Sequence, residues 1–181
     1  PDNWVGFFHT SDAGDGFAQH VNPLARATSS DRGATWALDE SLLLSESGSA
    51  SVYASEATGE WVMWRQLADD ERTVIQEISM DEGSTWTTTG CQVELGSSAW
   101  NAGAIRSVCA VESEDGQVSL WFAGSTSGEN ARSVLGRIRG TCEQGWSKPS
   151  IVIEAGEVGS WNEWEVFSPH VWRENGTWKL L

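Results

Sequence analysis

The stretch Ser29-Ser30-Asp31-Arg32-Gly33-Ala34-Thr35-Trp36 decides the fold, because the chain contains it twice. The second copy, Ser79-Met80-Asp81-Glu82-Gly83-Ser84-Thr85-Trp86, begins 50 residues later and keeps the same Ser, Asp, Gly, Thr and Trp. A degenerate third copy over residues 140–146 keeps a glycine and the tryptophan. Internal similarity at such a period is typical of proteins built from repeated supersecondary units.

A second repeat, a turn glycine followed by an aromatic-rich strand, runs between these copies. It stands at residues 59–64, 116–121 and 176–181, in steps of 57 and 60 residues, and residues 2–7 are the same strand one unit earlier. Each unit divides into four strand-length segments without a 3.6-residue period. In the third unit these segments are residues 107–112, 117–123, 132–139 and 146–154.

Four antiparallel strands in a unit of this length are typical of a propeller blade. We therefore expect an all-β chain, a β-propeller fragment of four-stranded antiparallel blades that supplies about three blades of a five- or six-bladed propeller. The expected blade parts lie at residues 1–46, 47–97, 103–155 and 167–181 of a single incomplete domain. The remaining blades of the same propeller are then its partners.

The octapeptide has the chemistry of a tight turn. Its aspartate is placed to accept backbone N–H bonds inside the turn, and its glycine supplies the positive φ that the turn needs. Its tryptophan opens the outer strand, where we expect it to bury its ring. Only one carboxylate recurs, whereas a cation-binding loop needs several oxygens, so a structural role is predicted. The residues concerned are Ser29, Asp31, Gly33, Trp36, Ser79, Asp81, Gly83 and Trp86.

These motifs resemble those of two carbohydrate-active families. The octapeptide resembles the Asp-box, or BNR repeat, of the sialidase superfamily, which implies a secreted location, either extracellular or periplasmic. Residues 167–181 resemble the inner hairpin of five-bladed arabinanase- and xylosidase-type glycoside hydrolases. In those enzymes a Glu, a small residue, Pro and His open the strand, and the Glu is the general acid. This chain keeps Pro169, His170 and the Asn175-Gly176 turn, and has Phe167 at the position of that Glu.

Composition excludes several classes of partner. The 181 residues contain 11 Lys+Arg and 26 Asp+Glu, a net charge of −15, which argues against nucleic acid and against anionic membrane surfaces. No apolar run is long enough for a membrane span, so no membrane insertion is expected. The chain begins at Pro1 and ends in an apolar run, and we interpret it as a piece of something longer.

The three cysteines, Cys91, Cys109 and Cys142, are odd in number and show no metal-ligand spacing. We expect each of them to be a small buried hydrophobe rather than part of a disulfide framework. The sequence also contains no phosphate-binding loop and no nucleophile elbow. We therefore predict no metal site and no cofactor.

Candidate site residues lie on the face with the longer, more variable loops and blade links, opposite the octapeptides. Arg106 enters an innermost strand, where sialidases place an arginine that clamps the substrate carboxylate. The alternative is a surface arginine paired with one of the many acids. Arg65 is a second clamp candidate, with the acidic residues 69–71 as rival partners.

The link over residues 159–167 supplies the catalytic candidates Glu163 and Glu165. Two carboxylates beside Trp161 and Trp164 could cleave a glycosidic bond while the rings stack on a sugar, provided that the stretch is extended. Glu165 is the better acid candidate, because it lies between Trp164 and Val166. The alternative is a solvated acidic loop. His170 could hydrogen-bond a sugar or be a satisfied polar core residue.

The sequence thus predicts a carbohydrate-active β-propeller, a sialidase-like glycoside hydrolase that cleaves glycosidic bonds by carboxylic acid/base chemistry on a glycan substrate. The alternative is a non-catalytic Asp-box propeller that binds glycans or proteins. Fold alone does not separate the two.

Overall fold

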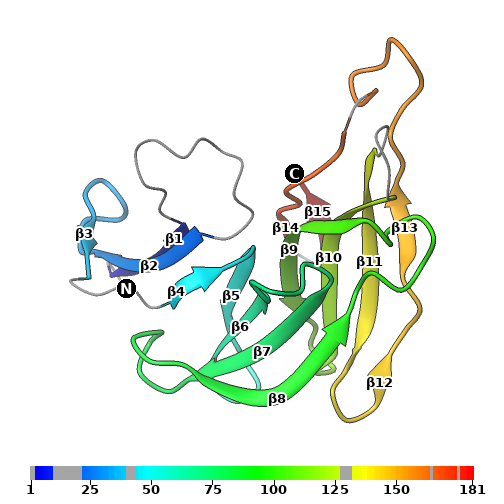
Figure 1. Cartoon of the computed structure of the whole chain (residues 1–181). Helices are drawn as coiled ribbons and strands as arrows, with labels where there is room; N and C mark the ends of the chain where they lie inside the picture. The colour runs from blue at the N-terminus through cyan, green and yellow to red at the C-terminus, as the bar shows by residue number, and fades with distance from the viewer. Residues whose placement is uncertain (1–2, 10–21, 40–43, 127–131, 164, 175) are drawn as a thin grey trace.

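The computed structural model describes residues 3–9, 22–39, 44–126, 132–163, 165–174 and 176–181, and its regular structure is entirely β (Figure 1). We call its four sheets blades 1 to 4. Blade 1 contains β1 (Trp4–His9), β2 (Asn22–Ser29), β3 (Ala37–Leu38) and β4 (Leu44–Ser47). Blade 2 contains β5 (Ala50–Ala54), β6 (Trp61–Gln66), β7 (Thr73–Ser79) and β8 (Thr87–Glu94). Blade 3 contains β9 (Ala104–Glu112), β10 (Val118–Ser125), β11 (Ser133–Thr141), β12 (Gly145–Trp146) and β13 (Ser150–Ile153), and blade 4 contains β14 (Val171–Glu174) and β15 (Thr177–Leu180).

The predicted four-stranded antiparallel blades are confirmed. Blade 2 has the strand order β5-β6-β7-β8, and blade 3 repeats it as β9-β10-β11 with an outer strand that is split in two. The sequence predicted one outer segment over residues 146–154, whereas β12 and β13 are separate. Pro149 lies in the gap, and proline has no N–H to continue a strand ladder.

The innermost strands β5, β9 and β14 belong to separate sheets and are joined by side chains. At both seams, the side chain of one strand accepts a backbone N–H of the next strand, which leaves these edge donors satisfied. We call this set the inner-strand clasp. Its pairs are Ser49–Val108, Ser51–Ala110 and Ser107–Ser168, each at 2.9 Å, and Cys109–Val171 at 3.3 Å.

The main core lies between blades 2 and 3. Trp64 and Phe122 are fully buried there, and the Trp64 ring meets that of Trp146 edge to face at 5.3 Å. β10 is buried along its whole length, as expected of a strand covered on both faces. No helix among the described residues is long and apolar enough to cross a membrane.

The prediction for two of the cysteines was wrong. Cys91 and Cys142 form a disulfide with a Cα–Cα distance of 5.8 Å, although 51 residues separate them. Cys91 lies on the outer strand of blade 2 and Cys142 in the turn after β11, so the bond ties two adjacent blades at their outer edges. Cys109 is buried and free, as predicted.

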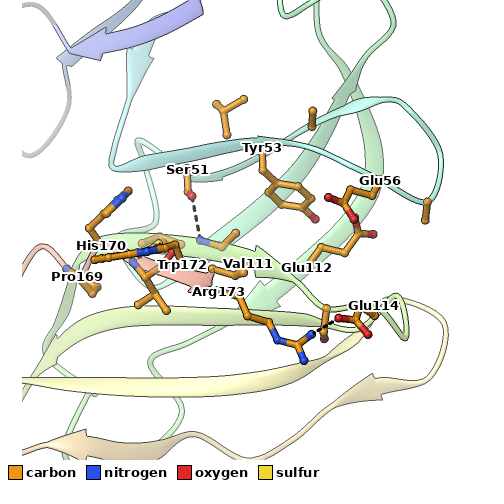
Figure 2. A pocket seen from close by; sticks show the side chains of 18 of the residues that line it. Ser51, Tyr53, Glu56, Val111, Glu112, Glu114, Pro169, His170, Trp172 and Arg173 are labelled. Atoms are coloured by element: carbon orange, nitrogen blue, oxygen red, sulfur yellow. Dashed lines mark hydrogen bonds and ion pairs between the residues drawn. The ribbon is translucent and has the colours of Figure 1, made fainter. Parts of the chain in front are cut away.

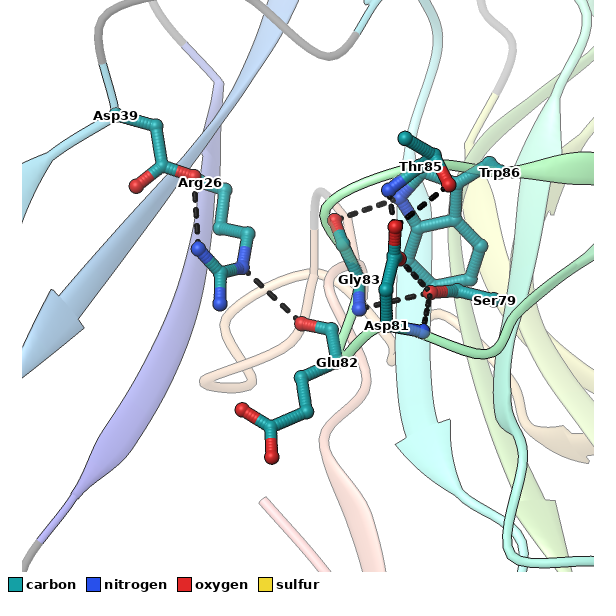
Figure 3. A network of polar contacts seen from close by, with 8 residues as sticks. All are labelled: Arg26, Asp39, Ser79, Asp81, Glu82, Gly83, Thr85 and Trp86. Atoms are coloured by element: carbon teal, nitrogen blue, oxygen red, sulfur yellow. Dashed lines mark hydrogen bonds and ion pairs between the residues drawn. The ribbon is translucent and has the colours of Figure 1, made fainter.

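The two octapeptides form equivalent turns after β2 and β7, which we call turn 1 (residues 29–36) and turn 2 (residues 79–86). In each turn the aspartate accepts the threonine N–H at 2.8 Å, and the serine hydroxyl accepts the glycine N–H at 2.8 Å. Figure 3 shows these bonds in turn 2. Gly33 and Gly83 have φ of 86° and 81°, as predicted, and so do the residues before them, Arg32 and Glu82, at 60° and 57°. Two consecutive positive φ values are typical of a type I′ turn.

The tryptophans of the two turns differ. The Trp86 ring is partly buried and packs edge to face on Phe7 of blade 1 at 5.9 Å. The Trp36 ring remains 40% exposed and contacts only Phe8 of its own blade, at 5.6 Å, among the aromatic rings of the described residues. Burial of both rings was predicted, so the prediction fails for Trp36.

Candidate functional site

A groove of 910 Å³ runs along β5, β9 and β14 (Figure 2). These innermost strands run in the same direction, so the groove has two distinct ends. The rim end lies where the strands begin, near Ala50 and Pro169. The turn end lies where they finish, near Glu56 and Glu114. The octapeptide turns belong to the turn end, because Ser79 pairs with Trp61 at the start of β6.

An aromatic wall faces the rim half of the groove. His170 and Trp172 point to the same side of the chain because they are two residues apart on an extended segment. Their ring centroids lie 5.5 Å apart, and Trp172 is 36% exposed. His170 is exposed, so the alternative of a satisfied core histidine does not describe it. The sequence interpretation missed Trp172, although its spacing from His170 could have revealed it.

The turn end holds a polar set that sequence reasoning also missed, made up of Tyr53, Glu56, Glu112, Glu114 and Arg173 (Figure 2). Arg173 forms an ion pair with Glu114 at 2.9 Å. Burial raises the pKa of Tyr53 to about 12, and the charge of Glu112 adds to the shift. The Tyr53 phenol therefore keeps its proton near neutral pH, which makes it a poor nucleophile.

The structure brings two predicted residues together at the rim. Arg106 Nη1 lies 3.0 Å from Glu165 Oε1, and both side chains are about one-third exposed. Beside this pair, the Ser107 hydroxyl accepts the N–H of Ser168, whose φ is 54°. The pair and the hydrogen bond fasten the link before β14 to the start of β9.

Glu163 does not join that pair. Its carboxylate accepts the N–H of Gly159 at 2.6 Å, and residues 158–163 form turns rather than an extended segment. The condition for both glutamates to share one side is therefore not met. Trp161 is 88% exposed and stands clear of the groove, whereas Trp164 lies outside the described residues.

Arg65 lies near the rim end of β6, opposite Ala50, but its side chain pairs within blade 2. Its guanidinium donates two hydrogen bonds to Glu77 of the neighbouring strand, at 2.9 and 3.1 Å. Both side chains are nearly buried, so this is a bidentate pair within the sheet. The rival partners expected for Arg65 were the acidic residues 69–71. Asp70 instead closes its own loop, and the Thr73 hydroxyl and Arg72 N–H lower its pKa.

Phe167 is 59% exposed, so the position at which the resembled hydrolases carry their general-acid Glu presents an aromatic ring and not a carboxylate. No group of three or more His, Cys, Asp or Glu residues that could hold a metal ion occurs in the part of the chain that the structure describes. The site therefore consists of an open groove, an aromatic wall, one rim ion pair and an acidic turn end.

Comparisons with known proteins identify the fold. No protein-family model and no curated protein matches the chain. Among solved structures, it is similar to an endo-1,4-β-xylanase from Bacteroides thetaiotaomicron (TM-score 0.65, 16% identity, 99% of this chain and 61% of that one). It is also similar to a thermostable family-43 glycoside hydrolase (TM-score 0.64, 10% identity, 99% and 62% coverage). A third is the GH93 α-L-arabinofuranosidase of Fusarium graminearum, in complex with arabinobiose (TM-score 0.54, 16% identity, 93% and 49% coverage).

At these identities the likeness shows the fold alone. The chain spans about half to three-fifths of the length of the three structures. Its sheets are blades of a β-propeller, as their internal repeat predicted.

Proposed function

We propose that this chain is part of a glycoside hydrolase built on a β-propeller, and that the glycan binds in the rim half of the groove. The observation that supports this best is the position of the groove. It lies over the innermost strands of a fold whose similar structures are glycoside hydrolases, one of them holding arabinobiose. Trp172 offers an aromatic face to a sugar ring, and His170 offers a hydrogen-bonding group beside it.

A neutral glycan suits this groove better than a sialic acid. Arg106 and Arg65, the two candidates for binding a substrate carboxylate, each already bind a carboxylate of the protein. The turn end adds more acids than bases, which repels anionic sugars. We therefore infer a neutral substrate such as an arabinosyl or xylosyl glycan, the sugars named for two of the similar structures. The sialidase-like activity stays a prediction with less support.

Glu165 is the proposed catalytic carboxylate, because its ion pair with Arg106 holds it beside the start of β9, one of the strands that the groove follows. Its ion pair with Arg106 requires the carboxylate form, so the pair must open before Glu165 can donate a proton. In the closed pair, Glu165 could instead stabilise positive charge that develops on the sugar. Glu163, on the same link, accepts the N–H of Gly159 instead, so we do not assign it the role of the second carboxylate.

Phe167 favours a second candidate function, a propeller that binds glycans without cleaving them. Its exposed ring stands where the resembled hydrolases carry their general acid. A ring at that position can stack on a sugar but cannot transfer a proton.

A hydrolysis and binding panel separates the two functions. The protein that contains this chain is assayed on arabinosyl, xylosyl, galactosyl and sialyl glycosides, with Trp172→Ala as the test variant. Trp4→Ala is the matched control, because Trp4 is 49% exposed and lies in blade 1 away from the groove. We expect Trp172→Ala to weaken neutral-glycan binding about tenfold, roughly 1.4 kcal/mol, and Trp4→Ala to leave it unchanged.

Glu165→Gln then tests the chemistry. We expect it to lower kcat with little change in binding, since it removes a reacting group rather than the aromatic wall. Full hydrolysis by Glu165→Gln would exclude Glu165 from the reaction. Glycan binding without turnover by the unmodified protein would establish the non-catalytic function.

The disulfide supports the proposed extracellular or periplasmic location. Bonds such as Cys91–Cys142 form and persist in oxidising compartments and are rare in reducing ones.

A further inference from the structure

Arg106 lies at an irregular point of β9, the innermost strand of blade 3. Ser107 pairs with Ala123 of β10, and Ile105 pairs with the next residue of β10, Gly124. Arg106 is thus an extra residue with no residue opposite it on β10. Such a β-bulge changes the direction of a side chain, and bulges are frequent beside active sites. The bulge therefore allows the Arg106 side chain to reach residues outside its own blade.

The Arg106 guanidinium contacts residues 165–168, which we call the rim segment. Its Nη1 lies 3.0 Å from Glu165 Oε1. Two backbone groups of the segment also bond to blade 3. The N–H of Val166 donates to the Ser133 carbonyl at 3.2 Å, and the N–H of Ser168 donates to the Ser107 hydroxyl at 2.9 Å. Of these three attachments, the Arg106 contact is the one made by charged groups.

The seam between blades 2 and 3 does not need such an arginine. Ser49 accepts an N–H of the next inner strand as Ser107 does, so Gly48 is the equivalent of Arg106. A glycine has no side chain that could pair with a carboxylate. Arg106 is therefore an addition to the repeated seam, made where the chain enters β14.

The rim segment ends at a strained residue. In the inner-strand clasp, Val108 and Ala110 are two residues apart, whereas Ser168 and Val171 are three apart. The extra residue coincides with a φ of 54° at Ser168. The left-handed region is strained for serine, and a residue before proline prefers an extended conformation. Ser168 keeps this conformation because the contacts around it hold it there.

Ser168 separates a fixed strand from the rest of the rim segment. After it, Pro169 is buried and lines the groove, and His170 exchanges two backbone hydrogen bonds with Leu181, at 3.0 and 2.9 Å. Before it, residues 165–167 belong to no strand, and Phe167 is 59% exposed. Rotation at Ser168 would therefore move Phe167 and the residues before it, and would leave the aromatic wall in place.

We propose that Arg106 is a positioning residue of the glycan site. Acting through Glu165, it holds the rim segment against the strain at Ser168 and so fixes Glu165 and Phe167 beside the rim end of the groove. The inference rests on the proposed function and applies to both of its candidates. Glu165 is the group assigned to hydrolysis, and Phe167 is the group that favours binding without cleavage.

Hydrogen exchange without any glycan tests whether Arg106 holds the rim segment. In the protein that contains this chain, Arg106→Met should make the Ser168 amide exchange about tenfold faster, because the strained residue is then free to relax. Arg139→Met is the matched control, since Arg139 forms an exposed ion pair with Asp115 at the turn end of blade 3. It should leave the Ser168 amide unchanged. Unchanged exchange of Ser168 in Arg106→Met would overturn the proposal.

Affinity for arabinosyl and xylosyl oligosaccharides tests the consequence for the site. Arg106→Met should weaken binding about tenfold, and Arg139→Met should not change it. The double variant Arg106→Glu/Glu165→Arg restores the ion pair with its charges exchanged. It should return the affinity and the Ser168 exchange to within about threefold of the unmodified protein, which a mere loss of packing would not do. Affinity that is unaffected by Arg106→Met, or is not restored by the double variant, would overturn the proposal.

Turnover separates this inference from the proposed function. If Glu165 is a reacting group, the double variant recovers binding but not kcat, because arginine stays charged and cannot replace a carboxylate. Recovery of kcat as well would remove Glu165 from the chemistry and leave Arg106 as a positioning residue. Failure of the unmodified protein to bind any of the glycans would refute the proposed function, and the exchange of Ser168 would still decide whether Arg106 holds the rim segment.

Discussion

Turn 1 and turn 2 share a sequence pattern and the same six hydrogen bonds through side chains, yet their surroundings differ. In turn 2, Gly83 is buried and Trp86 packs on Phe7 of blade 1. In turn 1, Trp36 is 40% exposed, and its one aromatic contact among the described residues is with Phe8 of its own blade. The octapeptide therefore specifies the shape of its turn, whereas the neighbouring blade determines how much the turn stabilises the fold.

The largest expected effect comes from the Cys91–Cys142 disulfide, which anchors β8, the strand after turn 2. Replacing both Cys91 and Cys142 by serine should lower the free energy of unfolding by about 4 kcal/mol, because the 51-residue separation closes a long loop in the unfolded chain. Urea unfolding measures it. Reduction of the unmodified protein is the matched control and should give a similar loss. An unchanged midpoint after reduction would contradict the prediction.

The tryptophans compare the two turns directly. Trp86→Ala should cost about 3 kcal/mol, because it removes a ring packed between blades, and Trp36→Ala about 1.5 kcal/mol, because that ring is partly in solvent. Urea unfolding of the two variants side by side gives the difference. Equal costs would show that the neighbouring blade adds nothing to turn 2.

Gly33 and Gly83 allow the backbones of the two turns to be compared. Both have positive φ, so alanine is strained at either position. A Cβ at Gly83 would lie 2.5 Å from Phe7 Cζ, whereas at Gly33 the nearest atom, of Trp4, is 3.0 Å away. We expect losses of about 2 kcal/mol for Gly83→Ala and about 1 kcal/mol for Gly33→Ala. A larger loss at Gly33 in thermal unfolding would refute this ranking.

The aspartates should give the smallest effect, and the same one in both turns. The hydroxyl and N–H of Thr35 lower the pKa of Asp31 to about 2, and the same two groups of Thr85 do so for Asp81, from an ordinary value of 3.8. A lowered folded-state pKa gives stability that is complete above about pH 4 and is lost as the pH falls through about 2.

Between about pH 4 and pH 2, the free energy of unfolding should fall less steeply in Asp31→Asn and in Asp81→Asn than in the unmodified protein. Each variant lacks one carboxylate that takes up a proton in this range. Urea unfolding at a series of pH values measures that slope. A slope identical to that of the unmodified protein would mean that the carboxylate has no such role.

Much of the fold could be predicted because its determinants are local and repeated. The spacing of Asp31 and Gly33 specifies a turn wherever it occurs, and the period of the copies then gives the blades. The partners that decide the site are distant in sequence. Arg65 pairs with Glu77 on the adjacent strand and not with the acidic residues 69–71 that are nearer in sequence. Cys91 and Cys142 are brought together only by the packing of two blades.

Two links with the same dipeptide show why loops are harder to predict. Trp100-Asn101 and Trp161-Asn162 follow their turn tryptophans at similar distances. Trp100 stacks on Phe122 at 5.7 Å and Asn101 is fully buried, whereas Trp161 is 88% exposed. The sequence shows where a tryptophan stands, but it does not show whether other parts of the fold pack against its ring.

The inner-strand clasp has a mechanical consequence. Adjacent blades meet along the axis through isolated side-chain bonds, so one seam can separate without breaking any strand ladder. The seam between blades 2 and 3 uses two serine hydroxyls, and the seam between blades 3 and 4 uses one hydroxyl and the Cys109 thiol. The Cys91–Cys142 disulfide also ties blades 2 and 3, and sulfur is the weaker acceptor, so a pulling force applied across the blades should open the second seam first.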